Sequence, residues 1–254
     1  MHTTRKHTAC VTPGPCAGLL TLAILGLAAL TVAPPASAQS HVYTLNNTYA
    51  DANGGPPLVP NGGTLGPSGY SFGANQGLAL SGALASGADY SIETLFTFSS
   101  LPGSRGYNKI LDFKNLGNDN GLYDFNGSLQ FYQGGPFATS PTALIPAGTP
   151  VDLLVTRSGA TGVFTASVNG VQQFSFLDTQ SQAVFDSPNN IIRFFQDDTV
   201  TGGSESAPGT VTRITVNAPV PEASTTVSLG LLLVMGLGGM VIAAKRKKQA
   251  RLPL

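Results

Sequence analysis

The chain has 254 residues, a formal net charge of zero, no tryptophan, and two cysteines, Cys10 and Cys16, both near the N-terminus. Residues 39–220 hold twelve acidic and six basic side chains, so this segment carries a net charge of about −6. Nucleic-acid binding needs clustered lysine and arginine, and zinc–thiolate sites, disulfides and cysteine nucleophiles need cysteine. All of these are therefore excluded for residues 39–220.

The first 38 residues have the layout of a secretory signal peptide. Arg5 and Lys6 form a basic start, an apolar run covers residues 19–32, and the small-residue tripeptide Ala-Ser-Ala occupies 36–38. The apolar run is short for a permanent span, which needs about 20 residues. We expect cleavage after Ala38 and export of the remaining chain, which then contains no thiol.

Residues 39–219 are predicted to form one all-β domain. The segment is rich in Gly, Pro, Ser, Thr and Asn, and its short apolar runs show no sustained helical period. The strongest predicted strand covers 89–98, where apolar and polar residues alternate. The same pattern predicts strands at 107–114 and 151–157, whereas the Gly- and Pro-rich stretch at 53–69 predicts a loop or an extended edge.

Two Asn-Gly pairs, at 126–127 and 169–170, predict β-hairpins. Both central residues of a type I′ turn need positive φ, which Asn and Gly adopt at least cost. In the first hairpin, a two-residue loop pairs Leu122 with Phe131. Both side chains are then expected on one face of the sheet.

The second hairpin is ambiguous in register. A two-residue loop at 169–170 places Phe174 and Phe176 beside Thr165 and Val163, and it leaves Phe164 on the opposite face. Either both faces of this hairpin are partly covered, or a β-bulge shifts the register.

The order of these elements resembles a laminin-G-like, concanavalin A-like jelly roll. The resemblance spans roughly residues 75–217 and is carried by the segments 90–96, 109–113, 121–125, 151–157, 167–171 and 209–214. It implies a two-sheet antiparallel β-sandwich. It does not carry a function with it, because one fold hosts many functions.

Catalytic residues are not expected in this domain. Sandwich glucanases use two carboxyl groups about 5–5.5 Å apart, supplied by glutamates on one strand. Here the only glutamates between 39 and 220 are Glu93 and Glu205, far apart in sequence. The one histidine, His41, lies beside the expected new N-terminus, where chain ends are usually too mobile for a catalytic triad. We expect no enzymatic activity; the alternative is a polysaccharide hydrolase with an unrecognised carboxylate pair.

A Gly-rich loop supplies three carboxylates within nine residues, from Asp197, Asp198 and Glu205. Calcium takes six to eight oxygen ligands, and such a loop can supply several of them. The three residues are therefore a candidate calcium site. The alternative is an ordinary solvated acidic turn, which the spacing favours because it matches no fixed calcium motif. The sequence leaves open whether a second acidic loop, at 118–120, lies nearby.

The candidate ligand-binding residues are Tyr107, Tyr123 and Tyr132. Carbohydrate recognition uses aromatic platforms flanked by polar side chains, and the domain has many Asn and Gln residues beside these tyrosines. Aromatic residues that alternate along a strand belong more often to the core than to a platform. Carbohydrate binding by these three tyrosines is thus a hypothesis, and a place in the core is the alternative.

The C-terminal segment, 220–254, has three elements in order. Residues 225–244 are uncharged and long enough to cross a bilayer, and the basic cluster at 245–248 places their C-terminal end in the cytoplasm. The sequence directly before the span reads Val220, Pro221, Glu222, Ala223, Ser224.

This order resembles the PEP-CTERM sorting signal. The resemblance implies that an exosortase, a membrane cysteine peptidase, recognises Pro221 and Glu222 and removes the tail. Ala223 stands where that family more often has proline. The whole chain is then expected to be a non-catalytic protein of the cell envelope or extracellular matrix that binds carbohydrate or acts structurally in an exopolysaccharide biofilm. The alternative is a permanently anchored adhesin with a protein partner.

Overall fold

The computed structural model describes residues 39–218. Within this range the backbone forms fifteen β-strands, and no helix there is long and apolar enough to cross a bilayer. The predicted signal peptide, 1–38, and the predicted sorting tail with its membrane helix, 220–254, lie outside the described residues. The strands are β1 (Gln39–Tyr43), β2 (Val59–Asn61), β3 (Thr64–Gly66), β4 (Gly69–Phe72), β5 (Gly77–Leu80), β6 (Tyr90–Phe98), β7 (Tyr107–Asp112), β8 (Asn120–Phe125), β9 (Ser128–Gln133), β10 (Pro136–Thr139), β11 (Val151–Arg157), β12 (Val163–Val168), β13 (Val171–Leu177), β14 (Ile192–Phe194) and β15 (Gly209–Ala218).

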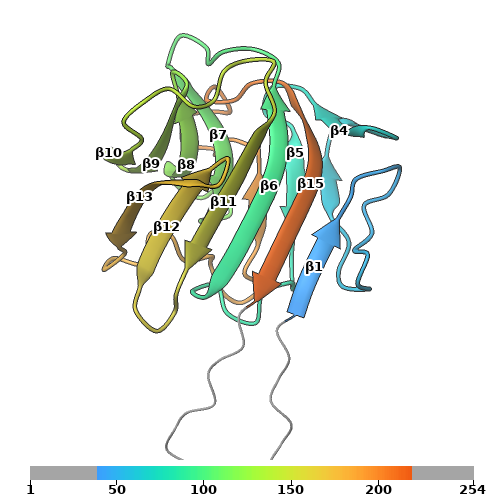
Figure 1. Ribbon diagram of the computed structural model, residues 1–254, viewed down its shortest axis with the longest axis horizontal. Helices are drawn as coiled ribbons and strands as arrows, with labels where there is room; N and C mark the ends of the chain where they lie inside the picture. The colour runs from blue at the N-terminus through green and yellow to red at the C-terminus, as the bar shows by residue number, and fades with distance from the viewer. Residues whose placement is uncertain (1–38, 219–254) are drawn as a thin grey trace, which may run out of the picture. The chain divides into compact units, whose positions relative to one another are not determined.

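The strands form two antiparallel sheets (Figure 1). Sheet A has the order β13-β12-β11-β6-β15-β4-β3, and β1 also pairs with β15. Sheet B has the order β10-β9-β8-β7-β14-β5-β2. The predicted all-β, two-sheet antiparallel sandwich is confirmed for the described residues.

The core lies between the sheets and is rich in aromatic side chains. On β6, the period-2 pattern buries Tyr90, Ile92, Phe96 and Phe98 on one face, as the sequence predicts. From the opposite sheet, the Phe113 ring approaches the rings of several core aromatics at centroid distances of 5.0–6.4 Å. Each fully buried aromatic or aliphatic side chain of this kind contributes about 1.5–3 kcal/mol to the free energy of folding.

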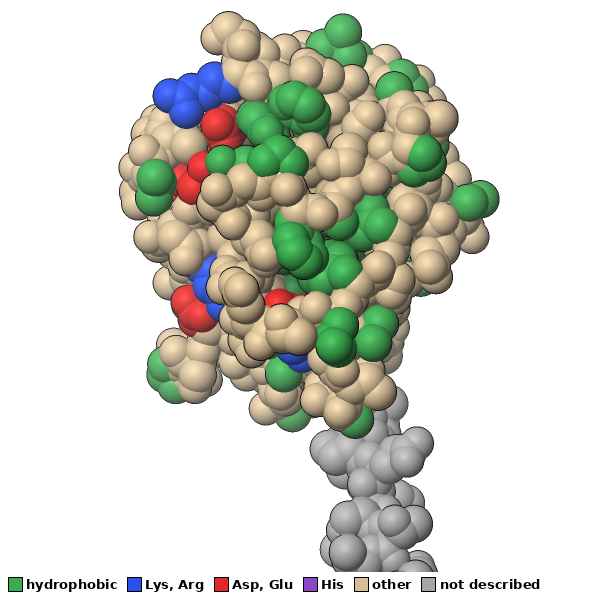
Figure 2. Space-filling view, turned by 90° about the vertical axis from the view of Figure 1, so that its left-hand side faces the viewer, with side chains coloured by type: hydrophobic (Ala, Val, Ile, Leu, Met, Phe, Trp, Pro, Cys, Tyr) green, Lys and Arg blue, Asp and Glu red, His purple; other side chains and the backbone are tan. Residues whose placement is uncertain are grey.

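The edge strands β10 and β13 lie at one side of the sandwich. Between them, the Phe137 ring contacts Phe176 at 4.9 Å and Phe131 at 6.4 Å between centroids. Figure 2 views this side and shows apolar side chains among mostly uncharged polar ones. Aromatic packing therefore closes the sandwich where the two sheets end.

The first predicted hairpin is confirmed in register. Asn126 and Gly127 both have positive φ, 50° and 89°, and Leu122 pairs with Phe131 across the ladder. The Asn-Gly turn is sufficient to fix the pairing of β8 with β9, because a two-residue loop allows only one register.

The second hairpin contains the bulge that the sequence left as one of two alternatives. The pairing runs Val168 with Val171 and then shifts between Ala166 and Ser167, so that Phe164 lies opposite Phe176. The rings of Phe164 and Phe176 stack at 5.1 Å. One extra residue on β13 thus moves its two phenylalanines to the core side.

The expectation of a mobile His41 is wrong. His41 is fully buried on β1, and its Nδ1 lies 2.7 Å from Asp51 Oδ2. Burial raises the pKa of Asp51, but hydrogen bonds from the backbone of Asn53, Val42 and Gly55 and from His41 outweigh it and hold the pKa below its usual value. Ladder pairing with β15 is what orders this end of the domain.

Candidate functional site

Strands β7, β8 and β9 present one row of aromatic side chains to the core and another to the outer face of sheet B. Leu122 and Phe131 belong to the core, so the neighbouring Tyr123 and Tyr132 point the other way. Tyr107 lies opposite Phe125 on the same outer face. The centroids of the Tyr107, Tyr123 and Tyr132 rings lie 5.5–6.0 Å apart. The three predicted ligand-binding tyrosines therefore form one cluster on this side of sheet B, in which Tyr123 is fully buried and Tyr107 and Tyr132 are half-buried.

The connection from β14 to β15, residues 195–208, runs alongside β7 and is hydrogen-bonded to it. The Lys109 N–H donates to the carbonyl of Glu205, and the Phe195 N–H donates to the carbonyl of Ile110. This connection brings Asp197, Asp198 and Glu205 to the outer face of sheet B, and all three residues are buried. The alternative of a solvated acidic turn is therefore wrong, because the three carboxylates are buried. Its capping role is correct for Asp198, which accepts the N–H groups of Val200 and Thr201.

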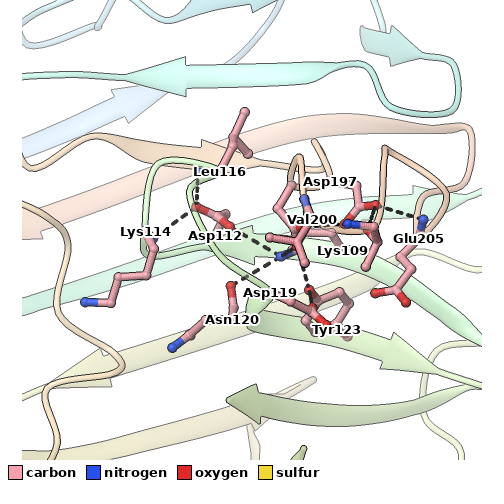
Figure 3. A network of polar contacts seen from close by, with 12 residues as sticks. Lys109, Asp112, Lys114, Leu116, Asp119, Asn120, Tyr123, Asp197, Val200 and Glu205 are labelled. Carbon is pink, nitrogen blue, oxygen red and sulfur yellow. Dashed lines mark hydrogen bonds and ion pairs between the residues drawn. The ribbon is translucent and has the colours of Figure 1, made fainter. Parts of the chain in front are cut away.

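Lys109 is the centre of the polar network, and sequence reasoning missed it. Its side chain is fully buried, and its Nζ donates to Asp198 Oδ2 at 2.8 Å, to the Asn120 carbonyl at 3.2 Å and to Asp112 Oδ2 at 3.3 Å (Figure 3). The ammonium also lies 4.4 Å from the centroid of the Tyr123 ring. A desolvated ammonium needs such fixed carboxylate partners, and the ring face adds a cation–π attraction.

Gly121 makes room for this lysine. A Cβ atom at Gly121 would lie 3.0 Å from Lys109 Cδ and 2.6 Å from the carbonyl oxygen of Leu111. A lysine inside the Asn-Lys-Ile-Leu-Asp strand pattern, with a glycine on the next strand, is the sequence signal that could have indicated a buried ammonium.

The two carboxylates that share Lys109 shift in opposite directions. For Asp198, burial raises the pKa, but Lys109 and the turn amides lower it more, so the pKa lies below its usual value. For Asp112, burial outweighs Lys109 and raises the pKa. Two causes explain the difference. The ammonium is nearer to Asp198 than to Asp112, and desolvation by burial has the larger effect on Asp112.

A second set of carboxylates lies beside the tyrosines. The Tyr123 hydroxyl lies 2.9 Å from Asp119 Oδ1 and 3.4 Å from Asp198 Oδ2, so the acidic loop at 118–120 does lie next to the loop that carries Asp197 and Asp198. Asp197 Oδ2 accepts the Thr201 hydroxyl, and Asp197 Oδ1 is buried with no hydrogen-bond partner among residues 39–218. Burial and the neighbouring negative charges raise the pKa values of Asp119 and Glu205.

Calcium binding by Asp197, Asp198 and Glu205 stays a prediction. In the part of the chain that the structure describes, no three His, Cys, Asp or Glu residues are grouped so as to hold a metal ion. The Lys109 ammonium already pairs with Asp198. The oxygen ligands that remain for a metal cation are Asp197 Oδ1 and the carboxylates of Asp119 and Glu205.

A pocket of about 530 Å³ lies elsewhere, lined by the small residues 85–88 and by Lys114. The Lys114 ammonium donates to the carbonyls of Ser181 and Val184 and to Asp186. Its charge and its hydrogen bonds are thus already used within the protein. The outer face of sheet B is the better candidate site, because it offers unpaired carboxylate oxygen and aromatic rings.

Comparison with known proteins gives a likeness of fold. No protein-family model matches the chain, and no curated protein is similar to it in sequence. Domain 4 of an extracellular arabinanase from Geobacillus stearothermophilus, solved with arabinotriose, is 16% identical, with a TM-score of 0.50 over 74% of this chain and 95% of that one. Trypanosoma rangeli sialidase is 16% identical, with a TM-score of 0.52 over 74% of this chain and 31% of the sialidase. A mutant of the same sialidase with trans-sialidase activity aligns equally well, over 75% of this chain.

These comparisons correct the expectation that the chain is not an enzyme. Solved structures with a similar fold include a domain of an arabinanase and part of a sialidase, both of them glycoside hydrolases. The absence of a paired-glutamate pattern therefore does not separate this chain from enzymes. At 16% identity the likeness concerns the fold, and the match spans about a third of the sialidase chain.

Proposed function

We propose that the domain binds carbohydrate on the outer face of sheet B and that its sandwich is of the concanavalin A-like jelly-roll type. The observation that carries this proposal is the cluster of Tyr107, Tyr123 and Tyr132 beside buried carboxylates. The apolar face of a sugar ring packs on tyrosine rings, and its hydroxyl groups donate to carboxylates such as Asp119. The half-buried rings of Tyr107 and Tyr132 are the accessible part of this platform.

The fold comparison supports this proposal in a limited way. A domain of similar fold was solved with arabinotriose, so the sandwich is compatible with an oligosaccharide ligand. The residues that would contact sugar here are those of this chain, on β7, β8 and β9.

The proposed setting is the cell envelope or the extracellular matrix. The signal peptide pattern at 1–38 supports export, and the resemblance of residues 220–254 to a PEP-CTERM signal supports recognition by an exosortase. The apolar segment at 225–244 would hold the protein in the membrane before processing. The carbohydrate partner would then be an exopolysaccharide of the biofilm.

A glycan-array screen of the exported protein tests the binding function. We expect binding to at least one polysaccharide class, and we expect Tyr107→Ala and Tyr132→Ala each to weaken it about tenfold, since losing a packed ring costs on the order of 1–2 kcal/mol. Phe137→Ala is the matched control, because Phe137 is a half-exposed aromatic residue at the β10 edge. Binding that survives both tyrosine variants would exclude this face as the site.

The intact mass of the protein recovered from cells tests the sorting proposal. We expect a product that lacks both the first 38 residues and the segment 231–251. A mass that retains 231–251 would favour the permanently anchored adhesin.

A further inference from the structure

The charges on the outer face of sheet B do not balance. The positive charge of Lys109 faces two negative charges, because Asp112 and Asp198 both lie within 3.3 Å of its ammonium. Beside this cluster stand Asp119, Asp197 and Glu205. Among the described residues, the one ion pair that these three carboxylates make is that of Glu205 with Arg105, at 3.4 Å, and the Arg105 side chain is 54% exposed.

The unmatched charge has a specific location. Asp197 is 2% exposed, and its Oδ1 has no hydrogen-bond donor within residues 39–218, whereas its Oδ2 accepts the Thr201 hydroxyl and the Glu205 N–H. A buried carboxylate oxygen without a donor is costly. The negative charges of Asp119 and Asp197 also raise the pKa of Glu205, after the larger effect of burial. Two cations, Lys109 and Arg105, thus face five carboxyl groups on this side of sheet B, so the site lacks positive charge.

We propose that the ligand of this face is a glycan with protonated amino groups, whose ammonium lies between Asp119 and Glu205 while its sugar rings pack on Tyr107 and Tyr132. This inference rests on the proposed carbohydrate-binding function and names the class of sugar. A glycan of uronic acids would meet like charges on this face and is disfavoured.

Lys109 provides an internal example of the same recognition. Its primary ammonium is held by two carboxylates and a carbonyl over the face of the Tyr123 ring. Tyr107 and Tyr132 stand next to Tyr123, with ring centroids 5.5 Å and 6.0 Å from it. A ligand ammonium beside them would find the same partners, a carboxylate pair and electron-rich rings.

Three β-1,4-linked hexasaccharides of the same length test the inference: one of glucosamine, one of N-acetylglucosamine and one of glucose. Only the glucosamine hexamer carries protonated amino groups. Titration of the exported protein at about pH 6.5 and low salt keeps carboxylates largely ionised and the amine substantially charged. We expect the glucosamine hexamer to bind about tenfold more tightly than either neutral hexamer, as one charge-assisted hydrogen bond provides. The preference should shrink when salt screens the charges.

Two variants locate the charge recognition. Asp119→Asn and Glu205→Gln keep size and the hydrogen bonds from Tyr123 and Arg105. Each should weaken the glucosamine hexamer more than the neutral hexamers, so that the preference for glucosamine falls about threefold to tenfold. Glu93→Gln, on sheet A, is the control and should change nothing. Equal binding of all three hexamers, or a preference that both variants retain, would overturn the inference and leave carbohydrate binding standing. Failure of every hexamer to bind, together with a negative glycan array, would instead reject the proposed function itself.

Discussion

The outer faces of the two sheets carry similar kinds of residue in different surroundings. On sheet A, Arg213 Nη2 lies 3.1 Å from Glu93 and 3.7 Å from Asp152, and these side chains are 33–42% exposed. On sheet B, Lys109 makes a similar contact with two carboxylates, but all three side chains are fully buried. The connection from β14 to β15 accounts for the difference, because it runs along β7 and supplies Asp198.

The comparison shows that burial decides what a charged triad can do. Water screens the Arg213 cluster, so its ion pairs contribute little to stability. The Lys109 cluster has lost its water, so each charge needs a fixed partner. The same desolvation raises the pKa values of Asp119 and Glu205 and turns this face into a candidate site.

The largest expected effect comes from removing the buried ammonium. Lys109→Met leaves Asp112 and Asp198 without their cation, and we expect a loss of about 3–5 kcal/mol in the free energy of unfolding at pH 7. Urea-induced unfolding measures it. The loss should be smaller at acid pH, because the two carboxyl groups can then take up protons. Arg213→Met is the matched control, and an equal loss in both variants would remove the contrast between the two faces.

Calcium provides the next test. If the ion uses the free oxygen of Asp197, calcium at a hundredfold excess over its Kd should stabilise the folded protein by about 2.7 kcal/mol. The rise in Tm should disappear in Asp197→Asn and persist in Glu93→Gln. A chelator-stripped protein whose Tm does not respond to calcium would reject the metal prediction, and Lys109 would then be the cation that organises the loop.

The sequence predicted the features that depend on local chemistry. The alternation in β6 and the Asn-Gly turn after β8 were sufficient to place strands and one register, because both signals lie within a few residues. For the β12–β13 hairpin the sequence left two alternatives, a β-bulge or two partly covered faces. The bulge is decided by the packing of Phe176 against Phe164, on the core side of sheet A.

The residues of the candidate site were proposed from the sequence, but their arrangement around Lys109 was not. The three tyrosines and the three acidic residues were all proposed, yet nothing in the sequence showed that they share one face. The general expectation that alternating aromatics are buried holds for Tyr123, which is fully buried, but not for the half-buried Tyr107 and Tyr132. Lys109 was missed because its partner Asp198 is 89 residues away, on a connection whose path no local pattern specifies.

Asp124 is a buried carboxyl group on the same strand as Tyr123, but on the side that faces the core. It shows what desolvation does to a carboxyl group without a cation beside it. Burial raises its pKa from 3.8 to about 6, although Gly127 N–H and Asn108 Nδ2 donate to it. Because the folded-state pKa is raised, the stability that protonated Asp124 gives is present at low pH and is lost as the pH rises through about 6.

We therefore expect Asp124→Asn to raise the free energy of unfolding at pH 7–8 by on the order of 2 kcal/mol. The asparagine can still accept the Gly127 N–H, and its amide can donate to Asn108 Oδ1, which has no partner among the residues described. Urea titrations at about pH 4 and pH 8 should show the gain at the higher pH alone. The exposed Asp186→Asn is the control, and an Asp124→Asn protein that is less stable than wild type at pH 8 would contradict the prediction.

The smallest effect belongs to the outer face of sheet A. Arg213→Met and Glu93→Gln should each lower the free energy of unfolding by less than about 1 kcal/mol, and a double-mutant cycle should give a coupling of about 0.2–1 kcal/mol. The coupling should fall further in about 1 M salt, where the Debye length is near 3 Å. A coupling of several kcal/mol, or one that salt does not change, would mean that the Arg213 cluster is as desolvated as that of Lys109. In that case exposure to water would not be what separates the two faces, and Glu93 and Asp152 would become a second candidate carboxylate site.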